Sequence, residues 1–172
     1  MLSITDQTRI WGSKSAPSLL LLLTVVMSGT PFFVPLQSMP QIYFSWMVVY
    51  YWSLFRPNVL PFILLFVAGL IQDIMVGFPM GVSALSFLLI RIVVTVCRRF
   101  ITAHQFWVVW AGFAITTLTL VVMTWSIMNV FFDHHGDILA MFLMVLLNWI
   151  IYPLCHVGCN ILYVKLPALQ VR

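Results

Sequence analysis

The stretch GLIQDIMVGFPMGVSAL, residues 69–85, predicts two helices that meet at a tight corner. Gly77 is placed to end the first helix, because glycine readily adopts the left-handed conformation that closes a helix. Pro79 follows where the next helix begins, a position that proline favours. Gly69 allows a second helix to approach closely, and Ala84 belongs to a small-residue face on that second helix. The stretch therefore predicts a closely packed helical hairpin.

Apolar residues dominate the sequence on both sides of this corner. Of the 172 residues, 63% are hydrophobic and only 7% are charged, whereas about one-quarter of a soluble domain is charged. Too few charges remain to cover a surface in water, and disorder requires the opposite composition. We therefore predict an all-α integral membrane protein. Its net charge of +4 is no sign of nucleic-acid binding, because the basic residues separate apolar segments.

Six apolar segments are candidate membrane spans, which together form a six-transmembrane-helix bundle. The approximate spans are 16–36, 40–55, 59–76, 80–97, 106–131 and 138–164, in a single membrane domain over 16–165, with cytoplasmic ends at 1–15 and 166–172. A cleaved signal peptide is the competing interpretation of the first segment. The second is short and rich in Trp and Tyr, so on length alone it could lie in the interface. The last two exceed the bilayer thickness, which predicts tilt.

The basic residues favour six spans with both termini in the cytoplasm. If the second segment crosses, seven of the eight Lys and Arg residues fall on one side, as the positive-inside rule expects. If it does not cross, most of them face outward. The seven residues are Arg9, Lys14, Arg56, Arg98, Arg99, Lys165 and Arg172.

Asp73 is predicted at membrane depth, where a charge costs at least about 2.5–3.5 kcal/mol at a helix centre. One interpretation is structural: the carboxylate accepts backbone N–H groups from the corner between Gly77 and Gly81. The other is functional: the carboxylate binds a partner, a cation or an adjoining loop. Both remain open on the sequence alone.

Arg91 is the one basic residue outside the predicted cytoplasmic segments. One interpretation is that its side chain extends toward the inner headgroups. The other is an interhelical polar contact, with His156, Asn160 or a free backbone carbonyl as its acceptor. The sequence does not decide between them.

No residue pattern indicates catalysis, a metal site or a cofactor. The sequence has four acidic residues, which leaves little room for two-carboxylate chemistry. Cys155, Cys159 and His156 are too few for a structural zinc site. Interhelical hydrogen bonds are expected from Asn148, Asn160, Thr116, Thr117 and Thr119, and positions in the aromatic belt from Trp46, Trp52, Trp107 and Trp110.

The pattern G-L-x-x-D, then G-x-P-x-G, then A-L resembles the family of the rod shape-determining membrane protein MreD. Its residues here are Gly69, Asp73, Gly77, Pro79, Gly81 and Ala84. Upstream, residues 51–58 (YWSLFRPN) are similar to the family's aromatic run, which ends in a cytoplasmic turn containing proline, here Pro57. Arg91 is not part of the family pattern.

The resemblance implies a non-enzymatic inner-membrane component of the bacterial cell-elongation complex, required for rod shape and side-wall peptidoglycan synthesis. It implies MreC as the direct partner, and through MreC the proteins MreB, RodA and a class B penicillin-binding transpeptidase. The family also resembles the six-helix substrate-binding subunits of energy-coupling-factor vitamin transporters. The alternative function is therefore such a subunit, with an outward cavity lined by Trp125, Asn129 and Asn148, because fold alone does not fix function.

Overall fold

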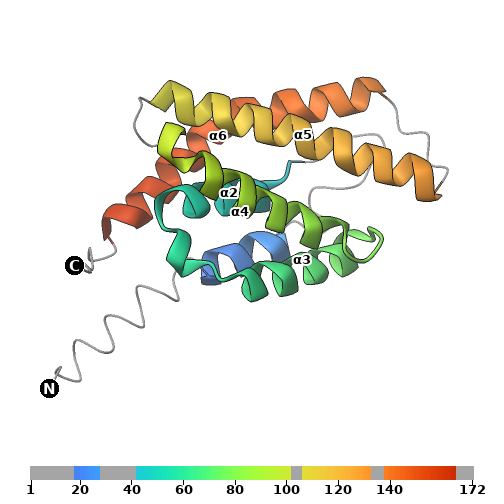
Figure 1. Ribbon diagram of the computed structural model, residues 1–172, viewed down its shortest axis with the longest axis horizontal. Coiled ribbons are helices and arrows are strands. Elements are labelled where there is room, and N and C mark those ends of the chain that lie inside the picture. Colours follow the sequence, from blue (N-terminus) through green and yellow to red (C-terminus); the bar gives the residue numbers. More distant parts are fainter. Residues whose placement is uncertain (1–17, 28–41, 102–105, 133–137, 166–172) are drawn as a thin grey trace, which may run out of the picture.

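The computed structural model describes residues 18–27, 42–101, 106–132 and 138–165, and this part of the chain is helical with no strand (Figure 1). A helix over Ser18–Met27 comes first. The labelled elements are α2 (Phe44–Phe55), the short 3₁₀ helix η2 (Pro57–Val59), α3 (Phe62–Val76), α4 (Val82–Ile101), α5 (Phe106–Phe132) and α6 (Ile138–Lys165). Residues 1–17, 28–41 and 166–172, and with them parts of the predicted first two spans and both predicted cytoplasmic ends, lie outside the described residues.

Successive helices run in opposite directions between the two ends of the molecule (Figure 1). Helices α2, α4 and α6 end on the left in Figure 1, where α3 and α5 begin, and α3 and α5 end on the right. Six crossings of a membrane need this alternation. The structure contains no membrane, so the individual spans stay a prediction.

Helix α2 is the centre of the bundle, although it has only 12 residues. Every residue of its Ser45–Leu54 segment is buried, which is expected of a helix that is apolar on all sides. Its neighbours include α4, α5 and α6. The short aromatic segment, which on length alone could lie in the interface, is enclosed by the other helices.

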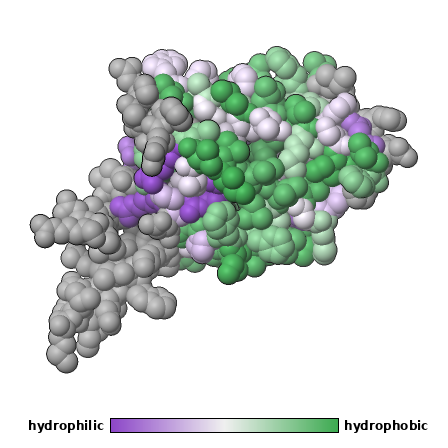
Figure 2. Space-filling view, viewed as in Figure 1, coloured by the Kyte–Doolittle hydropathy of each residue, from purple (hydrophilic) through white to green (hydrophobic). Residues whose placement is uncertain are grey.

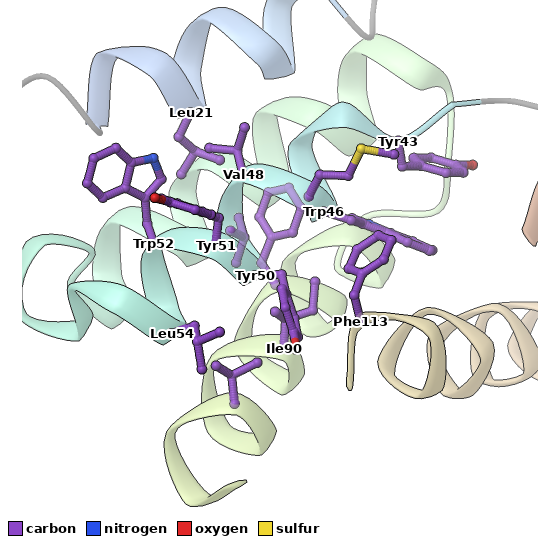
Figure 3. Close-up of a cluster of buried hydrophobic side chains, with 14 of the residues drawn as sticks. Leu21, Tyr43, Trp46, Val48, Tyr50, Tyr51, Trp52, Leu54, Ile90 and Phe113 are labelled. Atoms are coloured by element: carbon purple, nitrogen blue, oxygen red, sulfur yellow. The ribbon is translucent and has the colours of Figure 1, made fainter. Parts of the chain in front are cut away.

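Aromatic side chains fill the space between α2 and its neighbours (Figure 3). Tyr50 of α2 meets Phe113 of α5 edge-on, with ring centroids 5.3 Å apart, and Phe113 stacks on Tyr152 of α6 at 4.1 Å. Leu21 of the first helix is fully buried in the same cluster. In a bilayer, such contacts stabilise through close packing, because lipid is as apolar as the side chains themselves.

Trp46 and Trp52 do not lie in an aromatic belt as predicted. Their side chains are only 4% and 1% exposed, because both belong to α2 and α2 is enclosed. Trp107 at the start of α5 is 67% exposed, so it has the exposure that an interfacial residue needs. A tryptophan near a predicted span end can therefore lie either in the core or on the surface.

Helices α5 and α6 lie side by side and present most of their apolar surface outward (Figure 1). Among the described residues, Phe106–Phe131 and Met141–Leu162 are long and apolar enough to cross a membrane. Only 33% and 22% of their apolar windows are buried, whereas the core helix of a soluble protein would be mostly buried. Figure 2 shows a broad hydrophobic band across the middle of the visible face, with hydrophilic residues at its ends.

Pro153 interrupts the hydrogen bonding of α6, and α5 compensates for it. Proline has no N–H, so the carbonyl four residues earlier, that of Trp149, loses its helical donor. The indole N–H of Trp110 on α5 donates to that carbonyl at 3.0 Å. A carbonyl freed inside a membrane bundle needs such a partner from a neighbouring helix, and the bond joins α5 to α6.

Candidate functional site

The hairpin of α3 and α4 is the candidate functional site, because it contains most of the residues of the sequence motif. Gly69 on α3 lies directly against the backbone of Ala84 on α4. A Cβ added to Gly69 would lie 2.5 Å from the Ala84 nitrogen and closer still to its Cα. No side chain fits there, so the two helices pack at this point through their backbones.

Gly77 ends α3 in the left-handed conformation, with φ of +79°. The N–H groups of Gly77 and Phe78 both donate to the Asp73 carbonyl, at 2.9 and 3.0 Å. The second bond, which spans six residues, belongs to the Schellman type of helix end. The chain then passes Pro79 and reaches Gly81, with φ of +105°, before α4 begins.

The Asp73 carboxylate caps the start of α4 from a different helix. Its Oδ2 accepts the N–H of Gly81 and its Oδ1 accepts the N–H of Ser83, each at 2.8 Å. Gly81 immediately precedes α4 and has no side chain with which to cap it, so Asp73 supplies the oxygens that an N-cap residue would otherwise provide. The negative charge also lies at the positive end of the helix dipole. The side chain of Asp73 is fully buried.

Part of the small-residue face of α4 packs within the hairpin itself. The exposures of Ser83 and Ala84 are 4% and 1%, and the Ser86 hydroxyl donates to the Val82 carbonyl of its own helix at 2.8 Å. Ala84 packs against Gly69 of α3, whereas Ser83 and Ser86 line a cavity that α4 shares with α2, α5 and α6.

Arg91 joins the far end of the hairpin to the turn that precedes it. Its Nη2 donates to the carbonyl of Pro57 in η2, and its guanidinium carbon lies 5.5 Å from the centre of the Phe62 ring. The interhelical alternative with a backbone carbonyl is therefore the one that the structure shows, and the side chain is 7% exposed. Nε and Nη1 have no partner among the described residues.

The two other candidate acceptors for Arg91 have different neighbours. The amide oxygen of Asn160 faces the Tyr51 hydroxyl at 3.4 Å. His156 lies among aromatic rings, with its centroid 5.1 Å from that of Tyr51 and 5.2 Å from that of Phe106. Sequence depth placed these residues near Arg91, but depth does not say which helix face each one occupies.

Hydrogen bonds between helices involve asparagine more than threonine. Asn148 is fully buried and accepts the backbone N–H of Tyr43 at 3.1 Å, which joins α6 to the start of α2. The prediction for the threonines was wrong: Thr116, Thr117 and Thr119 each donate to the carbonyl four residues earlier in α5. A threonine hydroxyl on a helix lies close to the carbonyls of its own preceding turn, so it can donate there and needs no acceptor on a neighbouring helix.

Gln72 is a residue that sequence reasoning missed. It precedes Asp73, is fully buried, and has neither amide atom hydrogen-bonded within the described part of the chain. A long polar residue in an apolar run was the available signal. Within the same residues no group of three or more His, Cys, Asp and Glu side chains is placed to hold a metal ion.

The fold and the hairpin define the class of the protein: an all-helical membrane protein whose most specific sequence motif builds a helix corner. Residues 9–157 match the family model described as rod shape-determining protein MreD. The chain therefore belongs to the MreD family, a family of membrane proteins with a role in rod-shape determination. No curated protein and no solved structure matches the chain significantly. The likeness to vitamin-transporter subunits stays a prediction, and the comparisons give the transporter alternative no support.

Proposed function

We propose that the protein is a non-enzymatic inner-membrane component of the bacterial elongation complex, which acts by binding MreC during side-wall peptidoglycan synthesis. Membership of the MreD family supports the role in rod shape. MreB, RodA and a class B penicillin-binding transpeptidase are proposed as indirect partners. The single observation that carries the proposal is that the family motif coincides with the α3–α4 hairpin.

The hairpin is well suited to present a fixed surface to a partner helix. Backbone contact at Gly69 and the carboxylate bonds of Asp73 fix α3 against α4 from within. The outward surface of α3 then includes Ile63 and Ile74, which are 79% and 65% exposed. A partner helix that packs here would bind through close van der Waals packing. Such packing requires that the surface of α3 keep a fixed shape.

The orientation that we propose places both termini in the cytoplasm. Helices α2, α4 and α6 end on the same side of the bundle (Figure 1), and Arg56, Arg98 and Lys165 occur at those three ends. Clustering of basic residues on one side is the feature that sets cytoplasmic orientation.

Depletion of the protein in its host, followed by microscopy, tests the proposed role. We expect rods to become round as the protein is lost, because side-wall growth stops while division continues. Rods of normal width that persist after complete depletion would contradict the proposal. Vitamin auxotrophy without a shape change would instead indicate transport.

Co-purification of MreC with tryptophan variants tests the proposed contact. Ile74→Trp places a large ring on the outward surface of α3, and Ile115→Trp does the same on α5, where Ile115 is 68% exposed. We expect Ile74→Trp to lower the recovered MreC by about fivefold or more, as blocking a central contact does, and Ile115→Trp to leave it unchanged. Equal recovery with both variants would exclude this face of α3.

A further inference from the structure

A cavity of about 620 Å³ lies beside the Gly77–Gly81 corner. Its walls come from the start of α2, the corner itself, and the facing parts of α4, α5 and α6. Trp46, Ser86, Thr124 and Met144 are among the residues that line it. Its volume is within the range of about 300–1,000 Å³ that is usual for ligand sites.

Among the described residues that line it, the cavity wall is mostly apolar and contains no charged side chain. The hydroxyl of Ser86 donates to the Val82 carbonyl, and that of Thr124 donates to the carbonyls of Leu120 and Val121. These two hydroxyl protons are therefore already engaged inside their own helices. A ligand with an ionic group or a full set of polar groups would find few partners in this wall.

We propose that this cavity holds one acyl chain of a phospholipid from the surrounding bilayer. An apolar cavity does not retain water, whereas hydrocarbon gains dispersion contacts with every wall atom it meets. The flexible Met144 side chain adapts to a chain of variable shape. The charged headgroup stays outside, because the described residues of the wall include no charged side chain that could pair with it.

The occupant is bilayer lipid because the cavity is open and the apolar faces of α5 and α6 that border it point out of the bundle (Figure 2). Lipid is the molecule present at that surface at the highest concentration. The site goes beyond the binding of MreC, since it lies on the inner side of the corner and involves none of the outward residues of α3 named above.

The test uses the full chain in vesicles of phosphatidylethanolamine and phosphatidylglycerol, with a trace of phosphatidylglycerol carrying a diazirine at the end of one acyl chain. After illumination, labelled residues are mapped by mass spectrometry. We expect label at Val82 or Met144, which line the cavity. Label confined to outward-facing residues would overturn the proposal.

One matched pair of variants separates the cavity from the outer surface. Thr124→Phe fills the cavity, and Thr119→Phe adds the same ring on an exposed part of the same helix. We expect Thr124→Phe to lower the labelling of cavity residues by about tenfold. Thr119→Phe should leave that labelling unchanged. Circular dichroism of each variant confirms that it is folded. Equal labelling in both would overturn the proposal.

Discussion

The backbone of Gly69 on α3 lies directly against the backbone of Ala84 on α4, with no space for a side chain between them. The contact joins the two ends of the family motif, which are far apart in the hairpin sequence and adjacent in space. Other motif residues between them act on the same joint: Gly77 ends α3, and Asp73 caps α4. The motif therefore describes one structural unit.

Gly69→Ala is expected to destabilise the protein by about 1–3 kcal/mol, the usual cost of forcing a methyl group into a filled space. The atoms it meets are backbone atoms of Ala84, so the helices must move apart. Thermal unfolding in detergent measures the effect. Gly158→Ala is the matched control, because an added Cβ at Gly158 meets nothing within 4 Å; it should stabilise α6 by roughly 0.5–1 kcal/mol.

Asp73→Ala is expected to cost about 2–3 kcal/mol, because two N–H groups at the start of α4 lose their acceptors. Asp73→Asn should cost less, since the amide oxygen still accepts one of them. Thermal stability, membrane level, MreC co-purification and cell shape are the measurements. If all four are unchanged in Asp73→Ala, the role assigned to this carboxylate is wrong. Ser126→Ala is the control, because that hydroxyl bonds only within an exposed part of α5.

Substitutions at the two positive-φ glycines should follow an order set by backbone angle. Gly77 has φ of +79° and Gly81 has φ of +105°, and neither has an obstacle to a Cβ. Asparagine tolerates the left-handed region better than alanine does, so Gly77→Asn should be the mildest change and Gly77→Ala should cost about 1 kcal/mol. Gly81→Ala should cost more, since its φ lies farther from the left-handed minimum. Melting temperatures in the reverse order would contradict this account.

The sequence predicted the corner well because local chemistry determines it. A glycine that ends a helix and a proline that follows it need no long-range information. The structure shows Gly77 at the end of α3 and, of the two open interpretations of Asp73, the structural one, in which its carboxylate accepts N–H groups at the start of α4. The match to the family model then confirmed the resemblance that the motif had suggested.

Interactions that depend on which helix faces meet could not be predicted in the same way. The acceptor for Arg91 is a carbonyl at Pro57, 34 residues earlier, and its identity requires knowing how η2 lies on α4. The bond from Trp110 to the carbonyl freed by Pro153 has the same origin. Their positions near predicted span ends favour the aromatic belt for Trp46 and Trp52, whereas the enclosure of α2 places both in the core.

Replacing Arg91 by methionine is expected to change stability by less than about 1–2 kcal/mol. A buried charge with unpaired N–H groups gives little net stabilisation, and an apolar side chain of similar length often replaces it at no cost. Here Nε and Nη1 have no partner among the described residues, while Nη2 bonds to the Pro57 carbonyl. Unfolding by heat measures the difference. A loss above about 3 kcal/mol would show that the bond to Pro57 contributes far more than a typical buried pair.

Reporter fusions test the orientation of the whole bundle, and the outcome depends on α2. If α2 crosses the membrane, the end of the molecule where α5 finishes faces outward, and a fusion of alkaline phosphatase after Asp133 should be active. A fusion after Lys165, at the end of α6, should be inactive as phosphatase and fluorescent as green fluorescent protein. The basic residues favour this result, because Arg56, Arg98 and Lys165 then share the cytoplasmic side. Cytoplasmic signal after Asp133 would contradict it, and would mean that the helix at the centre of the bundle does not cross.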